Sequence, residues 1–135
     1  MNDMLARYSS TIYAVLRIVA GFLFFQHGLP KLLGGFGQNG PAPFPSQMWL
    51  AGIIEVFGGA AIALGLFTPV VAFITAGEMA VAYFQAHAPR GFWPIANGGE
   101  LAALYCFVFL YFSAAGSGKW SVDQLRRGAR RTRRI

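Results

Sequence analysis

The sequence predicts an all-α polytopic membrane protein, an antiparallel bundle of four transmembrane helices. Hydrophobic residues make up 56% of its 135 residues and charged residues only 12%, and the mean hydropathy is +0.49. The apolar residues also gather in four long stretches. Soluble domains carry about 25% charged residues, and about 20 apolar residues in a helix cross a bilayer. These observations exclude a disordered chain and disfavour a soluble helix bundle, whose helices would need polar outer faces.

The four apolar stretches place the helices at about residues 11–33, 47–67, 69–88 and 98–115. The segment after the first helix is rich in glycine and proline, which is typical of a loop. Only a tight turn fits between the second and third helices, with Pro69 in the first turn of the third helix. Pro89, Trp93 and Pro94 predict a second long loop before the fourth helix.

The basic residues predict how the chain is oriented. An even number of spans puts both termini on one side, and cytoplasmic segments carry an excess of lysine and arginine. Arg7, Lys119 and the C-terminal arginines therefore favour an N-in, C-in topology, with residues 1–123 as the membrane domain and 124–135 as a basic cytoplasmic tail. The tail residues expected to contact anionic lipid headgroups are Arg126, Arg127, Arg130, Arg131, Arg133 and Arg134. Nucleic acid is not expected as a partner, because no recognisable binding module accompanies this run.

Three ionisable residues fall inside the apolar stretches: Arg17, Glu55 and Glu78. Each needs a partner, because a charge at the bilayer centre costs about 3 kcal/mol or more. At a rise of about 1.5 Å per residue, they lie roughly 9, 18 and 13 Å from the cytoplasmic ends of their helices. We therefore expect a buried Arg17–Glu55–Glu78 cluster, which either holds the helices in register or handles protons or a polar substrate group.

A second polar layer is expected nearer the outer face, close to the two long loops. Its members lie at similar depths and combine donors and acceptors: Gln26, His27, Lys31, Gln85, His87 and Glu100. A quinone headgroup, a flat ring with two carbonyls, would suit a pocket of this kind. We therefore interpret the layer as a candidate ligand pocket with quinone as its candidate ligand. The alternative for His27 is an ordinary histidine at the membrane interface.

Other cofactors are disfavoured. Histidines on two helices are compatible with axial haem ligation, but His87 lies nine residues after Glu78, on the opposite face of the helix, and no further haem signal is present. No set of histidines and acids has the spacing of metal ligands, so no metal site is predicted. The single cysteine, Cys106, excludes a disulfide framework and is interpreted as a packing residue.

Short motifs of small and charged residues recur in a characteristic order and spacing. They are Leu16-Arg17 with Gly21; His27-Gly28 with Lys31; Gly52, Glu55, Gly58 and Gly59 with Leu64-Gly65-Leu66; Glu78-Met79 with Ala82; Gly98-Gly99-Glu100; Gly116-Ser117-Gly118; and Ser121-Val122-Asp123. With these motifs the chain resembles the DoxX family of small four-helix membrane proteins over about residues 16–123. The resemblance implies a multi-pass protein of the bacterial plasma (inner) membrane.

The resemblance is less specific about function. The family name comes from a terminal quinol oxidase complex, relatives include thiosulfate:quinone oxidoreductase subunits, and some members resemble partners of detoxifying enzymes in oxidative-stress complexes. Arg17, Lys31, Glu55 and Glu100 fall on the family's pattern, and Glu78 and His27 match it less closely. The resemblance names none of them as catalytic.

Three functions remain open. The favoured one is an accessory subunit of a membrane redox or oxidative-stress system, because no complete cofactor motif supports an autonomous enzyme. The second is a non-catalytic anchor or assembly protein, which would hold protein partners in the membrane or cytoplasm or assemble as a homo-oligomer. The third is a small carrier that uses the buried charges as a relay, although four helices are few for a transporter.

Overall fold

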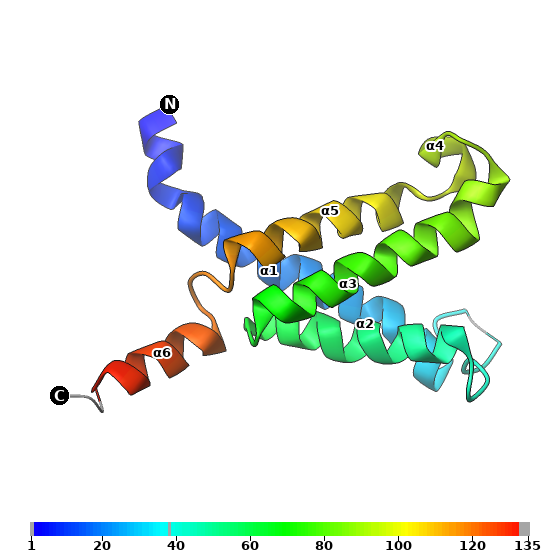
Figure 1. Cartoon of the computed structure of the whole chain (residues 1–135), viewed down its shortest axis with the longest axis horizontal. Coiled ribbons are helices and arrows are strands. Elements are labelled where there is room, and N and C mark those ends of the chain that lie inside the picture. Colours follow the sequence, from blue (N-terminus) through cyan, green and yellow to red (C-terminus); the bar gives the residue numbers. More distant parts are fainter. Residues whose placement is uncertain (1, 38, 133–135) are drawn as a thin grey trace.

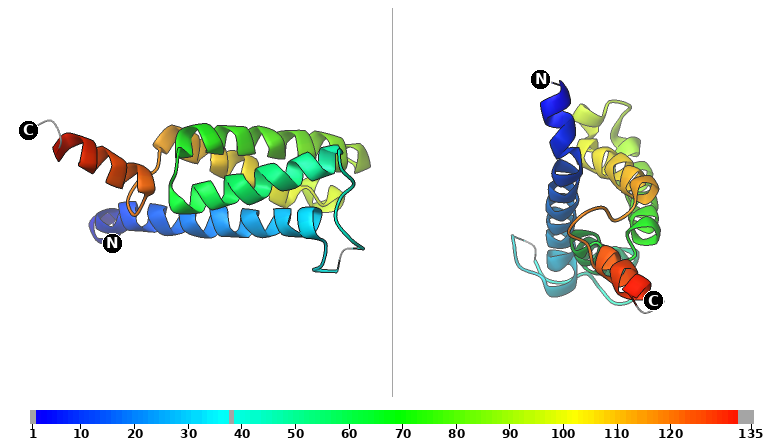
Figure 2. Two further views of the ribbon diagram at one scale, coloured as in Figure 1. Left: turned by 90° about the horizontal axis from the view of Figure 1, so that it is seen from below. Right: turned by 90° about the vertical axis from the view of Figure 1, so that its left-hand side faces the viewer.

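The structure is a computed structural model that describes residues 2–37 and 39–132. Four long helices run alternately up and down and carry the fold (Figure 1): α1 (Asn2–Leu33), α2 (Gln47–Leu64), α3 (Thr68–Ala82) and α5 (Glu100–Ala115). They associate mainly as two antiparallel pairs, α1 with α2 and α3 with α5. The start of α1 and the end of α5 lie at one end of the bundle, here called the terminal end, and the connection between α1 and α2 lies at the opposite end, here called the loop end (Figure 2).

Shorter helical elements occupy the connections. At the loop end, α3 continues into the π-helix η1 (Tyr83–His87) and the 3₁₀ turn η2 (Ala88–Arg90), and the short helix α4 (Pro94–Asn97) precedes α5. At the terminal end, α6 (Val122–Thr132) projects away from the bundle (Figure 1). No strand occurs in residues 2–37 and 39–132, so the expected all-α class is confirmed for the part that the structure describes.

Within the described residues, three helical segments are long and apolar enough to cross a membrane: Met4–Leu33, Gln47–Leu64 and Thr68–Arg90. The fourth apolar helix, α5, has 16 residues and is therefore about 24 Å long, shorter than a hydrocarbon core of about 30 Å. Large apolar side chains also cover the outer faces of the bundle, including Phe57, Phe73 and Phe107, which are 64–70% exposed. Such faces indicate contact with lipid chains rather than with water.

The helix boundaries differ from the expected ones where capping overrides hydropathy. The second helix ends at Leu64 rather than at residue 67, because Gly65 adopts a left-handed conformation with φ 68° and its N–H bonds back to the last turn. The first helix begins at Asn2 rather than at residue 11, so it continues beyond the apolar stretch.

The expected tail contains the helix α6. The hydroxyl oxygen of Ser121 accepts a hydrogen bond from the backbone N–H of Gln124 at 3.2 Å, which caps the start of this helix. Arg126 and Arg127 have exposed side chains. Arg133 and Arg134 lie outside the described residues, as do the side chains of Arg130 and Arg131.

Glycines form a close seam between α1 and α2. A Cβ atom built on Gly59 would collide with the backbone of Phe25 and would lie 2.7 Å from the carbonyl oxygen of Gly21. The second contact of the seam is equally close, because a Cβ on Gly28 would lie 2.7 Å from the carbonyl oxygen of Gly52. Small residues let membrane helices approach in this way. The seam makes α1 and α2 a tightly packed pair.

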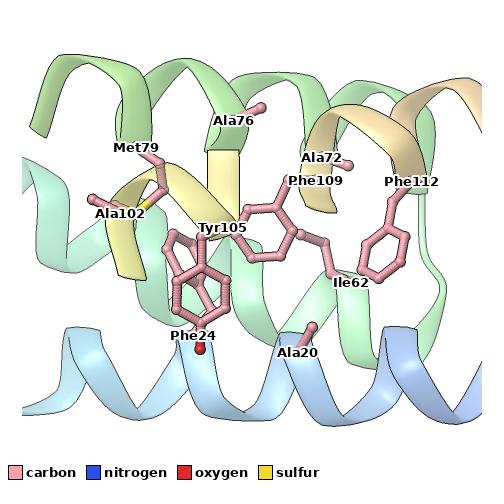
Figure 3. Close-up of a cluster of buried hydrophobic side chains, with 10 residues drawn as sticks. All are labelled: Ala20, Phe24, Ile62, Ala72, Ala76, Met79, Ala102, Tyr105, Phe109 and Phe112. Carbon is pink, nitrogen blue, oxygen red and sulfur yellow. The ribbon is translucent and has the colours of Figure 1, made fainter. Parts of the chain in front are cut away.

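Large side chains fill the space between the two pairs (Figure 3). Phe24 on α1 packs edge-on against Phe109 on α5, with ring centroids 4.7 Å apart, and lies 5.5 Å from Tyr105. Ile62 and Phe112 extend this core toward the terminal end. The pairs are therefore joined by aromatic side chains rather than by close backbone contact.

Candidate functional site

A pocket of about 810 Å³ lies between the two helix pairs, and all four long helices contribute to its walls. Its lining joins polar side chains, among them His27, Lys31, Gln47, Glu55, Glu78, Gln85 and His87, to apolar ones such as Phe24, Ile54, Ile74, Met79, Val81, Leu101 and Tyr105. Phe24, Met79 and Tyr105 also belong to the aromatic core. The pocket therefore lies between that core and the loop end of the bundle.

One ion pair crosses the wall made by α1 and α2. The Nζ atom of Lys31 donates to Oε1 of Glu55 at 2.6 Å. The Glu55 side chain is 3% exposed and that of Lys31 is 26% exposed. The glycine seam brings the two residues together, because a Cβ on Gly52 would lie 2.9 Å from the Cβ of Lys31, one helical turn from Glu55.

Three carboxylate oxygens in the pocket have no partner among the described residues. They are Oε2 of Glu55 and both oxygens of Glu78, and all three are shielded from solvent. Glu55 and Glu78 lie on opposite helix pairs, on α2 and α3, and both line the pocket. Buried polar atoms are normally hydrogen-bonded, and the exceptions often mark functional sites. The carboxyl groups of the pocket therefore have unused hydrogen-bonding capacity among the described residues.

One exposed border of the pocket is apolar. Leu50, Ile74, Val81 and Leu101 line the pocket, yet each is 46–53% exposed on the outer face of the bundle. An opening bordered by such side chains faces the acyl chains in a membrane. A second exposed border, at the loop end, is polar and includes Gln47 and Gln85.

The π-helix η1 supplies the loop-end rim. Gln85 accepts a hydrogen bond from the side-chain amide of Gln47 on α2 at 2.5 Å, which links the two helix pairs across the rim. The Nδ1 atom of His87 lies 3.2 Å from the carbonyl oxygen of Asn97. Asn97 is almost fully buried and donates to the carbonyl oxygen of Gly91 at 2.9 Å, which holds the η2–α4 connection in place. π-helical turns frequently occur at functional sites.

The structure does not bring Arg17 to the carboxylates. Its side chain is fully buried at the terminal end, where it donates to carbonyl oxygens at the end of α2 and in the segment before α6. The acceptors are Ile62 and Ala63 at 2.7 Å, Trp120 at 2.9 Å and Lys119 at 3.1 Å. The carbonyl oxygens and the negative dipole end of α2 provide the partner that the guanidinium requires. The expected Arg17–Glu55–Glu78 cluster is therefore wrong in its arginine, and Lys31 is the cation that pairs with Glu55.

Asp123 forms a second set of hydrogen bonds at the terminal end. Its carboxylate accepts from the hydroxyl of Ser117 at 2.5 Å and from the backbone N–H of Thr68 at 3.4 Å, at the first turn of α3. Partial burial acts to raise the pKa of Asp123, but the hydrogen bonds from Ser117 and from the backbone at Phe67 and Thr68 outweigh it and hold this pKa below its ordinary value. Beside it, the Arg126 guanidinium lies 4.9 Å from the centre of the Phe67 ring.

Residues from both expected layers line the one pocket described above. His27, Lys31, Gln85 and His87 line the pocket as the outer layer predicted, together with Glu55 and Glu78 from the expected inner cluster. Gln26 and Glu100 are exposed and lie outside the lining. Ser46 and Gln47 at the start of α2 also line the pocket and were not anticipated. The serine before an apolar run, which is typical of a helix start, was their signal.

The groups that bind metals do not converge in the described residues. Among residues 2–37 and 39–132, no three histidine, cysteine, aspartate or glutamate side chains lie close enough to hold an ion. Cys106 is a half-buried free thiol that packs against the core.

Comparison with known proteins places this geometry in a family. The DoxX family model matches residues 12–88. An uncharacterized protein of Haemophilus influenzae is 45% identical over 130 residues, covering 91% of this chain and 96% of its own length. An uncharacterized membrane protein of Mycobacterium tuberculosis is 29% identical over 129 residues, covering 81% of this chain and 77% of its own length. No solved structure matches the chain. The resemblance seen in the motifs is thereby confirmed, and the chain belongs to the DoxX family of membrane proteins.

Proposed function

We propose that this protein is an accessory subunit of a membrane redox or oxidative-stress system and that it binds a small quinone-class molecule in the pocket between its helix pairs. The pocket with its unpartnered carboxylates is the observation that carries the proposal. Its volume of about 810 Å³ falls within the range of roughly 300–1,000 Å³ typical of ligand sites.

The access route supports a ligand that dissolves in the membrane. Apolar side chains border the opening, so a molecule can enter from the lipid without crossing water. The aromatic floor made by Phe24 and Tyr105 suits a flat ring, and the charged wall suits polar substituents on that ring. Quinones combine these properties.

The proposed topology is four spans in a bacterial inner membrane, with both termini in the cytoplasm. The short helix α5 would complete the fourth span by thinning the bilayer locally or by relying on its pairing with α3. The arginines of α6 would then lie against the cytoplasmic headgroups, and the pocket would lie toward the outer leaflet.

Binding of a naphthoquinone to the purified protein in nanodiscs tests the proposal. Equilibrium dialysis should give saturable binding with one ligand per chain, because the pocket is a single cavity lined by one copy of the chain. The variant Ala82→Phe fills the pocket from α3 and should abolish binding. Glu100→Gln is the matched control, since this acid is exposed and outside the lining. Non-saturable uptake equal to that of empty nanodiscs would refute the pocket assignment.

The anchoring function remains a second candidate because α6 is exposed and strongly basic along the part that the structure describes. An anchor that uses this helix should lose its protein partners when residues 128–135 are removed. The truncation must stop there, because Trp120 and Asp123 help to hold the bundle together. Retention of every co-purifying partner by the shortened chain would exclude the tail as the docking element.

A further inference from the structure

The side-chain nitrogen of Lys31 brings free hydrogen-bond donors to the pocket. Its Nζ atom lies 2.6 Å from Oε1 of Glu55, so one hydrogen lies between these two atoms. If the pair is ionic, the ammonium has three N–H groups and uses one of them on Glu55. If the proton has moved to the carboxyl group, the neutral amine keeps both of its own N–H groups. The nitrogen therefore retains donors for a ligand in either protonation state.

The position of this nitrogen is fixed from two directions. Glu55, whose side chain is 3% exposed, holds it at the pocket wall. The lysine stem lies against α2, because a Cβ atom on Gly52 would lie 2.9 Å from the Cβ of Lys31. A lysine in the last turn of a membrane helix otherwise extends its ammonium toward the headgroups. The ion pair and the close glycine keep Lys31 in the pocket lining instead.

Other polar side chains of the pocket are less strictly donors. His27, Glu78 and Tyr105 each donate or accept, depending on a tautomer, a proton or a rotatable hydroxyl group. The amides of Gln47 and Gln85 bond to each other at the exposed rim, where water competes for their remaining groups. The remaining N–H groups of Lys31 are held in place by its partner, and a charged donor makes stronger hydrogen bonds than a neutral one.

We propose, on the basis of the function above, that the Nζ atom of Lys31 binds one carbonyl oxygen of the quinone-class ligand and that Glu55 is a positioning residue that keeps this nitrogen in the pocket. A carbonyl oxygen only accepts hydrogen bonds, so it matches the retained N–H groups. Phe24 and Tyr105 in the same lining offer aromatic faces to the ring of that ligand. The two carbonyl groups of the ligand then become unequal, because only one of them lies at Lys31.

Infrared spectroscopy of 2-methyl-1,4-naphthoquinone bound to the full-length protein in nanodiscs tests this inference. Isotopic labelling of the carbonyl carbons separates the stretching bands of the ligand from those of the protein. A carbonyl group that accepts a hydrogen bond vibrates at a lower frequency than a free one. We expect one carbonyl band of the bound ligand to lie below its position in empty nanodiscs, while equilibrium dialysis of the same sample shows saturable binding.

Substitutions at Lys31 separate a ligand contact from a purely structural role. Lys31→Met removes the donor, so the shifted band should return to its position in lipid and binding should weaken about tenfold. Lys31→Arg again supplies charged donors and should restore the shifted band. Lys119→Met is the matched control, because it removes the same charge from an exposed lysine outside the pocket.

A double variant covers the case in which Lys31→Met does not fold. Lys31→Met combined with Glu55→Met removes the whole ion pair and leaves no buried acid without its cation. It should lack the shifted band, as the single variant does.

Glu55→Leu tests the positioning role. Lys31 is then still present, but its ammonium is free to extend toward the headgroups. The shifted carbonyl band should therefore weaken although the donor itself remains. A band as strong as in the wild-type protein would overturn the role given to Glu55.

The outcomes distinguish this inference from the proposed function on which it rests. Saturable binding with both carbonyl bands at their positions in lipid would overturn the inference and leave the quinone-class function standing. A shifted band that persists in Lys31→Met or in the double variant would do the same, because another group would then hold the carbonyl oxygen. Absence of saturable binding to the wild-type protein would refute the proposed function itself.

Discussion

The terminal end and the loop end of the bundle differ in how many hydrogen-bond partners their buried ionisable side chains have. At the terminal end, Arg17 is fully buried and its two terminal nitrogens donate to four carbonyl oxygens from two segments, while its Nε has no partner among the described residues. At the loop end, Glu55 and Glu78 are buried with three oxygens unpartnered among the described residues. Apolar surroundings impose the same demand on both groups. The difference favours a structural role for the arginine and supports the proposal that the glutamates bind a ligand.

The largest expected effect comes from Arg17→Leu. The substitution removes the guanidinium that donates to the carbonyl oxygens of Ala63 at the end of α2 and of Trp120 before α6, and it disconnects these two segments. We expect a loss of more than about 3 kcal/mol in the free energy of unfolding and a sharp fall in folded yield. Chemical unfolding in detergent micelles measures the loss, with Arg7→Leu on the exposed start of α1 as the control. If the Arg17 variant were as stable as the wild-type protein, Arg17 would have no structural role.

The second-largest loss of stability is expected from a substitution in the glycine seam between α1 and α2. Gly59→Ala places a methyl group against the backbone of Phe25 and the carbonyl oxygen of Gly21, so α1 and α2 must separate. We expect a destabilisation of about 1–3 kcal/mol by thermal unfolding. Gly77→Ala is the matched control, because nothing lies within 4 Å of a Cβ at that helical position, and it should be neutral or slightly stabilising. Equal effects of the two variants would show that the seam is not closely packed.

Replacement of Glu78 should raise the stability of the protein, whereas replacement of Arg17 should lower it. Glu78→Met removes a shielded carboxylate without partners and adds an apolar side chain of similar size to an apolar wall. We expect a gain of about 1 kcal/mol in stability together with loss of ligand binding, the usual compromise between stability and function. Thermal unfolding without ligand measures the gain. A marked loss of stability would mean that Glu78 supports the fold.

The smallest effect is expected at Asp123, and it depends on pH. Because the pKa of Asp123 is held below its ordinary value, its contribution is present above about pH 4 and is lost as pH falls through the folded-state pKa. Asp123→Asn should cost about 0.5–1 kcal/mol at pH 7, a modest value because water screens this partly exposed group. Unfolding at pH 7 and pH 3 checks the expectation, since the difference from wild type should shrink at the lower pH. A difference independent of pH would exclude the charge as its source.

The helices were predictable from the sequence because hydropathy and helix-breaking residues alone define them. The apolar stretches located α1, α2, α3 and α5, and the Gly- and Pro-rich segment located the first loop. Hydropathy did not reveal α6 or the early start of α1, because helices also continue through polar residues. The left-handed cap at Gly65 and the π-helical end of α3 likewise leave no mark in mean hydropathy.

The site was half predictable. Depth along the helix axis grouped His27, Lys31, Gln85 and His87 in one layer, and all four line the cavity, although their role in binding stays a prediction. It failed for Arg17 because depth does not specify which neighbour a side chain faces, and because backbone carbonyls, its real partners, are invisible in a list of charged residues. The pairing of Lys31 with Glu55 depends on the close approach of the helices at Gly52. Its signal in the sequence was the position of Glu55 one turn after that glycine.

The bonds of Arg17 also impose an order on biosynthesis. The guanidinium pairs with carbonyl groups 102 and 103 residues further along the chain. At a synthesis rate of about 5–20 residues per second, these partners emerge roughly 5–20 s after the arginine itself. During that interval the guanidinium can pair only with the carbonyl oxygens of Ile62 and Ala63. A chain that stops before residue 119 therefore lacks two of the four hydrogen bonds that hold this buried arginine.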